Sequence, residues 1–389
     1  MKKILLYIFL ALVLLALQAV LFNWMFVTRM LTYPGETAVT AVDWYTPKAV
    51  VPGRPGTPLP VAVGEEAGFT AAALDSIVEY AGQNNSAALL VLHRGRIALE
   101  KYWEGHSAQS TTNAMSMAKT VLALLVGVAI EDGFIDSEAD PVAKYIPEWA
   151  GDARAEITIK DMLQMSSGLR VYADQNDPFS DLVQIYLGTD AAATALKVPQ
   201  VQPPGGGFFY NNVNTQVLGV LLERATGQPF AEYLSHKIWQ PIGAGDAAYW
   251  LDREGGMAKT FCCFFATARD WLRLGQMMLD RGRVGEQQVI PESWLQKMLT
   301  PTPFEPDYGL HVWLAYSEDG RRKKHRSEPF IARDMFYLDG ADIQRVYVIP
   351  SYELVIVRVG NDVPGMWDDA FVPNTLIRGT VKERMKGKG

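Results

Sequence analysis

Cysteine is almost absent from this chain: 389 residues include only two, and these are neighbours, Cys262 and Cys263. Adjacent cysteines cannot join distant parts of a chain, which excludes the disulfide framework common in small exported proteins. They could close a small ring with each other, but two small buried apolar residues are the simpler interpretation. The five histidines and two cysteines form no zinc-binding pattern. We therefore expect no metal and no organic cofactor.

The sequence also lacks an excess of positive charge, internal repeats and a Gly-x-Ser-x-Gly motif. A formal net charge of -7 argues against nucleic acid as a main partner. The missing Gly-x-Ser-x-Gly motif excludes an α/β-hydrolase nucleophile elbow. Hydrophobic residues are plentiful, however, at 49% of the chain, and can bury a large core. This composition predicts one catalytic unit built of two subdomains.

A long apolar run, Ile4–Phe22, follows the first three residues. Its length is close to the roughly 20 residues that cross a bilayer, and no clean cleavage site follows it. Lys2 and Lys3 favour a cytoplasmic N-terminus, although Arg29 weakens that bias. We expect a single-pass transmembrane anchor over residues 1–28 that places the catalytic part outside the cytoplasmic membrane. A cleaved signal peptide is the alternative.

The order of the remaining segments predicts an α+β fold. Short apolar runs bounded by turn residues indicate two early strands near residues 87–99 and further strands over 334–359, with mostly helical patterns between them. We therefore expect a mostly antiparallel sheet flanked by helices, with an inserted helical subdomain at about 110–330. Repeated prolines indicate a linker before this domain. The predicted organisation is a linker over 29–66, a domain over 67–380 and a basic tail over 381–389.

The first candidate catalytic motif is Ser116-Met-Ala-Lys119, which precedes an apolar run at 121–130. If that run is a buried helix, Ser116 lies in its first turn, where unpaired N–H groups and the helix dipole favour negative charge. Lys119, three residues later, lies on the same helix face and can reach the serine oxygen. Serine is a weak nucleophile until a base takes its proton. The motif alone also fits a helix-capping serine followed by a solvated lysine.

The second candidate motif is Tyr210-Asn-Asn212, which follows a loop containing two prolines and three glycines. An ammonium group beside Tyr210 would lower the pKa of its phenol. Tyr210 could then take the Ser116 proton and return it to a leaving group. Asn212 could hydrogen-bond Lys119 or a substrate amide. A surface aromatic residue followed by a helix cap is the alternative for this motif.

Together these motifs resemble the serine β-lactamase and penicillin-recognising superfamily, in particular its class C-like branch. That branch includes class C β-lactamases, D-alanyl-D-alanine carboxypeptidases and family VIII esterases. The resemblance extends over about residues 66–380. Within this range, the sequence segments resemble those of 6-aminohexanoate-dimer hydrolases most. Three further segments carry it, Ile157–Leu169, Leu218–Gly227 and Ala266–Asp270.

The resemblance implies a fold of the β-lactamase type and a role for each motif residue. Ser116 would be the acylated nucleophile, Lys119 its proton partner and Tyr210 the general base and acid. The backbone N–H groups of Ser116 and Ala341 would form the oxyanion hole, with Gly340 in the third family motif.

This third motif, Leu338-Asp339-Gly340, departs from the family pattern. Relatives that bind a substrate carboxylate carry Lys or His and then Thr or Ser here, whereas Leu338 is neutral and Asp339 would repel an anion if it faced the cleft. We therefore expect a serine hydrolase that cleaves a small-molecule ester or amide without a carboxylate at that location. Two alternatives remain. One is a β-lactamase or D-alanyl-D-alanine carboxypeptidase type of cell-wall enzyme, and the other is a catalytically silent binding protein.

Overall fold

The computed structural model describes residues 4, 5, 7, 23–62, 64–315 and 325–381. Its helices are α2 (Trp24–Thr32), α3 (Ala71–Gln83), α4 (Ala118–Glu131), α5 (Ile159–Leu163), α6 (Asp181–Leu187), α7 (Ala191–Lys197), α8 (Asn212–Thr226), α9 (Phe230–Leu234), α10 (Ala268–Leu279), α11 (Glu292–Met298) and α12 (Phe371–Arg378). Its strands are β1 (Lys48–Val51), β2 (Ser86–His93), β3 (Arg96–Tyr102), β4 (Thr111–Asn113), β5 (Ala247–Trp250), β6 (Phe264–Thr267), β7 (Arg283–Val284), β8 (Gln287–Gln288), β9 (Trp313–Leu314), β10 (Phe336–Gly340), β11 (Gln344–Ile349) and β12 (Leu354–Gly360).

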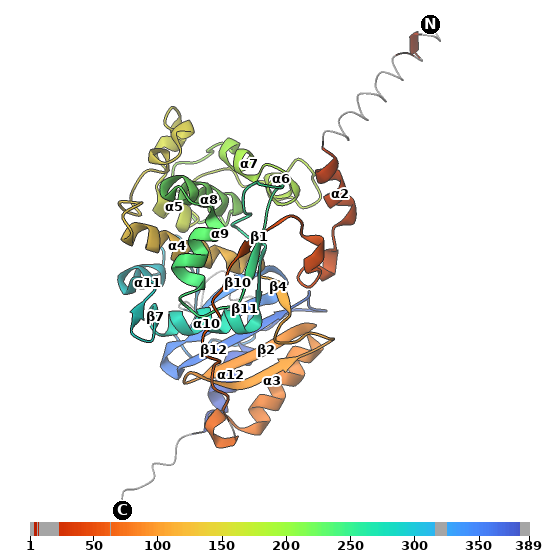
Figure 1. The fold of residues 1–389 in the computed structure, drawn as a ribbon, viewed down its shortest axis with the longest axis vertical. Coiled ribbons are helices and arrows are strands. Elements are labelled where there is room, and N and C mark those ends of the chain that lie inside the picture. Colours follow the sequence, from red (N-terminus) through yellow and green to blue (C-terminus); the bar gives the residue numbers. More distant parts are fainter. Residues whose placement is uncertain (1–3, 6, 8–22, 63, 316–324, 382–389) are drawn as a thin grey trace, which may run out of the picture.

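The larger sheet has the strand order β3-β2-β12-β11-β10-β9, and each neighbouring pair is antiparallel. The early strand β2 pairs with the late strand β12, where Leu90 lies opposite Val357. Alternate residues of these strands face two different hydrophobic clusters, one shared with α10 and one shared with α3 and α12. The sheet is therefore covered by helices on both faces (Figure 1). The α+β architecture and the pairing of early with late strands agree with the expectation from the sequence.

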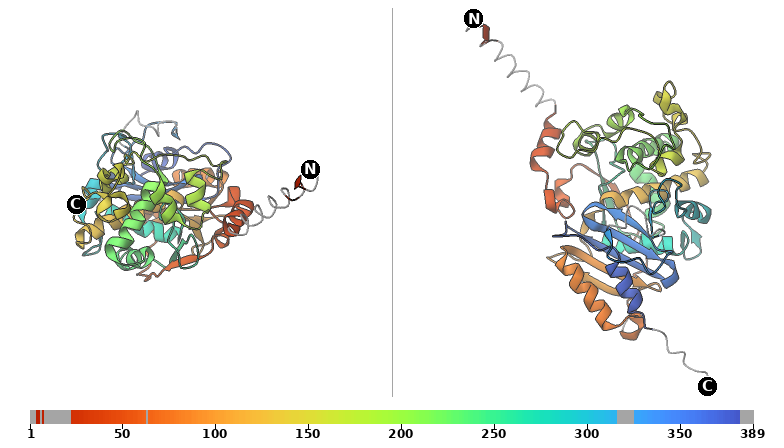
Figure 2. Two further views of the ribbon diagram at one scale, coloured as in Figure 1. Left: turned by 90° about the horizontal axis from the view of Figure 1, so that it is seen from above. Right: turned by 180° about the vertical axis from the view of Figure 1, so that it is seen from behind.

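A mostly helical part lies beside the larger sheet (Figure 2). Its central helix is α4, whose residues from Ala118 to Ala129 are all buried, as the continuous apolar run predicts. Helix α11 packs closely on α4 because Gly127 leaves room for Trp294, whose ring atoms would lie 2.0 Å from an added Cβ. The structure also contains a smaller sheet, β1-β5-β6-β4, which the sequence analysis does not predict. Strands β4, β5 and β6 come from within the predicted helical insertion.

The predicted transmembrane anchor over 1–28, and with it the placement in the cytoplasmic membrane, is contradicted. Across residues 4, 5, 7, 23–62, 64–315 and 325–381, no helix combines the length and the apolar character needed to cross a bilayer. Residues 8–22, the middle of the predicted span, lie outside the described residues. Helix α2 has nine residues, which corresponds to about 13 Å, against a hydrocarbon core of about 30 Å. It packs on the domain through Arg29, which is buried.

The segment 29–66, expected to be a linker, also packs on the domain. Strand β1 pairs with β5 over four residues, from Lys48 opposite Trp250 to Val51 opposite Ala247. Tyr45 is completely buried. This packing follows from the aromatic and β-branched residues that lie between the prolines. The repeated prolines draw attention away from these residues and suggest a linker instead.

Candidate active site

Ser116 lies in a sharp turn between strand β4 and helix α4. The preceding residue, Met115, has a φ of 49°, in the left-handed region that non-glycine residues rarely adopt. The turn is held by Asn113, whose Oδ1 accepts a hydrogen bond from the Met115 N–H at 3.0 Å. The short 3-10 helix η4 (Met115–Met117) then leads directly into α4. The sequence expectation of a serine at the entrance of a buried helix is therefore met.

Lys119 is buried beside Ser116, with only 1% of its surface exposed. Its Nζ lies 2.8 Å from Ser116 Oγ and donates a second hydrogen bond, also 2.8 Å, to the carbonyl oxygen of Phe261. Burial lowers the pKa of Lys119 from 10.5 to about 7, although the carboxylate of Asp339 acts in the opposite direction. At neutral pH, a large fraction of this amine is therefore uncharged and able to accept a proton. The solvated lysine that the motif alone allowed is excluded.

Tyr210 lies over the amine of Lys119. The centre of its ring is 5.1 Å from Lys119 Nζ, and the ring stacks on Trp313 at 6.2 Å with an interplanar angle of 25°. The structure thus brings the two sequence motifs together. The aromatic surroundings fix the orientation of the tyrosine ring, which helps a proton-transferring group because it is held in place before substrate binds.

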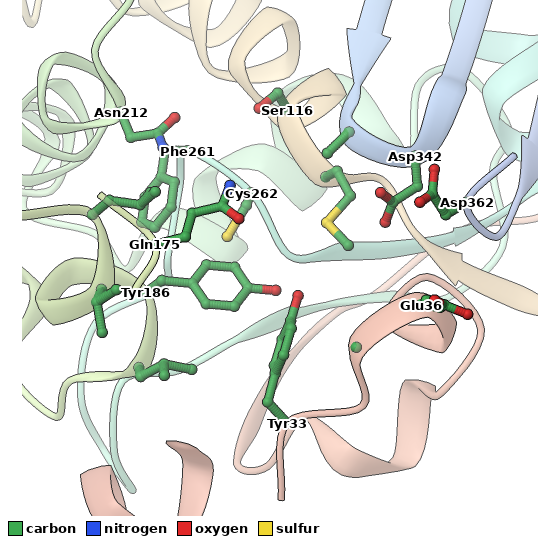
Figure 3. Close-up of a pocket in the computed structure, with 16 residues that line it drawn as sticks. Tyr33, Glu36, Ser116, Gln175, Tyr186, Asn212, Phe261, Cys262, Asp342 and Asp362 are labelled. Carbon is green, nitrogen blue, oxygen red and sulfur yellow. The ribbon is translucent and has the colours of Figure 1, made fainter. Parts of the chain in front are cut away.

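Asn212 is the first residue of α8 and lines the same cavity as Ser116 (Figure 3). Its Oδ1 is buried, and it accepts no hydrogen bond from the part of the chain that the structure describes. The capping role belongs to the preceding residue, Asn211, whose side chain accepts the N–H of Val213 at 3.0 Å. Asn212 therefore presents a buried acceptor to the cavity, and a substrate N–H group would satisfy it.

Strand β10 runs past the turn that carries Ser116. A Cβ added to Gly340 would lie 2.4 Å from the carbonyl oxygen of Ala114, so only glycine allows this approach. The next residue, Ala341, lines the cavity together with Ser116. Ser116 and Ala341, the two residues expected to supply the oxyanion-hole N–H groups, therefore line the same cavity.

The carboxylate of Asp339 is neutralised by an arginine that the sequence analysis missed. Asp339 lies opposite Arg345 in the β10–β11 pairing, and the two side chains form an ion pair. Arg345 is buried and also pairs with Asp369, with 2.8 Å between Nε and Oδ1. Leu338 is completely buried. The family position that binds a carboxylate in relatives thus offers no free positive charge here.

The cavity has a volume of about 500 Å³ and a markedly acidic lining. Glu36, Asp342 and Asp362 line it, whereas the described residues of its lining include no Lys, Arg or His (Figure 3). Burial and the neighbouring Asp362 raise the pKa of Asp342 to about 6. Apolar side chains from α6, including Leu182 and Leu187, line another part. Sequence reasoning missed these residues because they come from segments outside the catalytic motifs.

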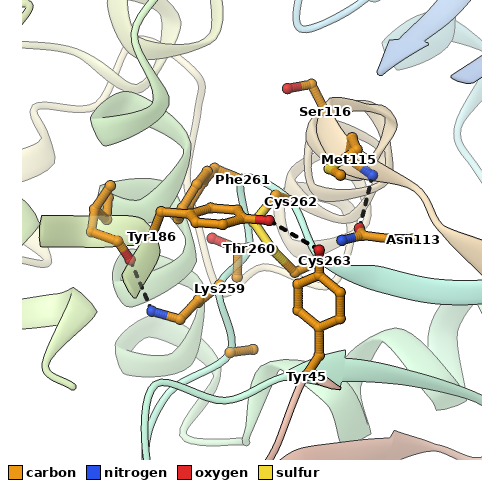
Figure 4. The surroundings of a disulfide bond; sticks show 12 residues. Tyr45, Asn113, Met115, Ser116, Tyr186, Lys259, Thr260, Phe261, Cys262 and Cys263 are labelled. Carbon is orange, nitrogen blue, oxygen red and sulfur yellow. Dashed lines mark hydrogen bonds between the residues drawn. A yellow bond between two sulfur atoms is a disulfide. The ribbon is translucent and has the colours of Figure 1, made fainter. Parts of the chain in front are cut away.

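The two cysteines are joined in a disulfide between neighbouring residues (Figure 4). This corrects the expectation of two reduced, packed thiols. Cys262 lines the cavity, and the preceding residue is Phe261, whose carbonyl oxygen accepts the hydrogen bond from Lys119. The disulfide therefore belongs to the backbone segment that holds the amine of Lys119.

Comparison with known proteins agrees with this arrangement. A family model described as Beta-lactamase matches residues 71–376. A 6-aminohexanoate-dimer hydrolase from Paenarthrobacter ureafaciens is 31% identical over 267 residues, which are 65% of this chain and 67% of that protein. A protein of Escherichia coli, provisionally assigned as a D-alanyl-D-alanine carboxypeptidase, is 24% identical over 46% of this chain and 48% of its own length.

Solved structures show the same fold. A Bacillus anthracis protein provisionally assigned as a 6-aminohexanoate-dimer hydrolase has a TM-score of 0.73 at 22% identity, covering 88% of this chain and 92% of its own. A D-stereospecific amidohydrolase from Streptomyces has a TM-score of 0.59 at 18% identity and covers 80% of this chain and 100% of its own.

Proposed function

Because this chain belongs to the β-lactamase family and is a serine hydrolase, we propose that Ser116 is its nucleophile and cleaves an ester or amide through an acyl-enzyme. The observation that supports this most is the buried Lys119 amine, which lies 2.8 Å from Ser116 Oγ. Its pKa of about 7 suits a proton acceptor at neutral pH.

The reaction that we propose has two halves. In the first, Ser116 Oγ attacks the substrate carbonyl carbon while its proton passes to Lys119 or Tyr210, and the N–H groups of Ser116 and Ala341 bind the oxyanion. Collapse of this intermediate breaks the bond to the alcohol or amine, which leaves with the proton. In the second half, water attacks the acyl-enzyme, the acid departs, and Ser116 regains its proton.

We also propose that the preferred substrate is a linear ester or amide that has no carboxylate beside strand β10. Three observations support this preference. Asp339 is already paired with Arg345, the part of the cavity lining that the structure describes has no positive charge, and three carboxylates face the cavity. The hydrolase from Paenarthrobacter is named for a dimer of an amino acid, so a linear amide that carries an amino group is a suitable first substrate to test.

Two covalent probes test the nucleophile and separate the alternatives. A fluorescent fluorophosphonate should label the wild-type protein, whereas the Ser116→Ala variant should not be labelled. Ser107→Ala, which removes an exposed serine outside the cavity, is the matched control and should retain labelling. Labelling by fluorescent penicillin as well would favour the β-lactamase or carboxypeptidase alternative. If neither probe labels folded wild-type protein, the proposed nucleophile is wrong.

The role of Tyr210 has its own test. Replacing it by Phe keeps the ring that stacks on Trp313 but removes the hydroxyl group. We expect the rate of phosphonate labelling to fall by about 100-fold or more, as is usual when a general acid or base is lost. A Tyr210→Phe variant that is labelled at the wild-type rate would exclude this residue as the proton carrier.

A further inference from the structure

The segment from Trp24 to Tyr45 lies before the region that the family model matches, residues 71–376. It nevertheless supplies three residues to the lining of the Ser116 cavity, Tyr33, Gly35 and Glu36. Figure 3 shows Tyr33 directed into the cavity at the end away from Ser116, with Glu36 on the side of Asp342 and Asp362. The catalytic cavity is therefore completed by a part of the chain outside the family domain.

Arg29 anchors this segment to the wall that carries α6. Its guanidinium donates hydrogen bonds to the carbonyl oxygens of Leu187, Gly188 and Asp252 at 3.1, 3.0 and 2.9 Å. It also lies 4.7 Å from the ring centre of Trp250. A buried guanidinium whose donors are satisfied by carbonyl groups on distant loops holds those loops together. Leu187 itself lines the cavity, so the anchor and the cavity wall are continuous.

Further contacts fix the segment beside the nucleophile. The Tyr45 hydroxyl donates to the carbonyl oxygen of Ala38 at 2.7 Å and lies 3.2 Å from the hydroxyl of Tyr186, a cavity residue of α6. The carbonyl oxygen of Val39 accepts the N–H of Asn113 at 2.9 Å. Ala38 and Val39 form a small buried cluster with Met115, the residue before Ser116. Several independent contacts therefore hold the segment in one position.

We propose that Tyr33, Gly35 and Glu36, held in place by the rest of segment 24–45, form a substrate-selecting wall of the active site, in which Tyr33 and Glu36 contact the end of the substrate that extends beyond the scissile group. This wall rests on the proposed function, because that function makes the cavity a substrate site. Tyr33 is 42% exposed, so part of this residue is accessible to a bound chain. Its ring meets that of Tyr186 edge to face, with 6.0 Å between centroids, and together the two rings suit an aliphatic chain. Glu36 suits an amino group at the end of that chain.

Binding to an inactive protein tests the wall separately from the chemistry. In the Ser116→Ala background, the Kd of two amides is measured by calorimetry: N-butylhexanamide and its analogue with a terminal amino group on the hexanoyl chain. We expect Tyr33→Ala to raise the Kd of N-butylhexanamide about tenfold, the effect of losing one good aromatic contact. We expect Glu36→Gln to raise the Kd of the amino analogue about fivefold, because an exposed ion pair contributes modestly.

The matched control is Leu31→Ala, which removes an 81% exposed side chain of the same segment that does not line the cavity. This variant should bind both amides as its parent does. If Tyr33→Ala or Glu36→Gln stays within about twofold of the parent on its own probe, a change of under about 0.4 kcal/mol, the proposal is overturned. Absence of measurable binding to the Ser116→Ala parent would overturn it as well. Failure of the proposed function would instead appear as absent phosphonate labelling of the wild-type protein.

Discussion

If Lys119 is the group that takes the serine proton, acylation of Ser116 should rise with pH through a midpoint near pH 7, because the amine must be uncharged to accept that proton. Burial lowers the pKa of Lys119 from 10.5 to about 7, a shift that corresponds to about 5 kcal/mol. At pH 7 about half of the amine is then neutral, compared with roughly 0.03% for an ordinary lysine. The direction follows directly: protonation below the midpoint removes the base, so the labelling rate falls toward acid pH.

The assay is the rate constant of fluorophosphonate labelling of the wild-type protein between pH 5 and 9. We expect about one tenth of the plateau rate at pH 6 and about nine tenths at pH 8, as a single group of pKa 7 dictates. A midpoint near pH 10, or a rate independent of pH, would refute the assignment of Lys119 as the base.

Removing the charge of Asp339 gives a second, directional test of the same reasoning. The Asp339 carboxylate raises the pKa of Lys119, so Asp339→Asn should move the midpoint of the labelling profile below pH 7. Arg345 keeps its pairing with Asp369 in this variant. Asp75→Asn, an exposed carboxylate on α3, is the control and should leave the midpoint in place. A shift of the Asp339→Asn midpoint to higher pH would contradict the electrostatic argument.

Three further predictions concern the strand beside the nucleophile, the buried histidine and the acidic lining. Gly340→Ala should slow phosphonate labelling by about 100-fold or more, because the added Cβ would lie 2.4 Å from the Ala114 carbonyl oxygen and displace strand β10, which leads to the Ala341 N–H. Labelling at the wild-type rate would show that β10 does not serve the reaction. Burial and nearby Lys119 lower the pKa of His311 to about 3. As the pH falls below 6.5, this histidine therefore becomes protonated in the unfolded chain before it does in the folded protein. The free energy of unfolding should fall from pH 6.5 toward pH 3, by about 2 kcal/mol at pH 5. Urea unfolding should therefore show a smaller loss of stability between pH 7 and 5 for His311→Gln than for the wild type, and equal losses would count against this role. The pKa of Asp342 is raised to about 6, so this carboxylate loses its negative charge below pH 6. The KM for an amine-bearing amide should therefore increase below pH 6, whereas the KM for its neutral analogue should not. The same pH dependence in Asp342→Asn would assign the effect to another group.

The local parts of the site could be predicted from the sequence. Ser116 and Lys119 meet because residues three apart share one face of a helix, and this needs no knowledge of the rest of the fold. That early strands pair with late ones was also predictable, because the strand-like apolar runs recognised in the sequence lie near the two ends of the domain.

Contacts between distant segments could not be predicted in the same way. Phe261, whose carbonyl oxygen holds Lys119, is 142 residues away along the chain, and no motif marks a backbone oxygen. Arg345 neutralises Asp339 only because the register of β10 and β11 places them opposite each other. The sequence alone therefore did not show whether Asp339 faces the cleft as a repelling charge.

The division between local and distant contacts has a functional consequence. Ser116 and Lys119 depend mainly on one helix entrance, whereas Tyr33, Asp342 and Asp362 reach the cavity from segments far apart in the sequence. Substitutions of these three side chains should change the shape and charge of the cavity without removing either partner of the contact between the Lys119 amine and Ser116 Oγ. We therefore expect substrate preference to change with these side chains while the proposed acylation chemistry is kept, because the side chains that take the serine proton in our proposal are not those that would contact the far end of a substrate.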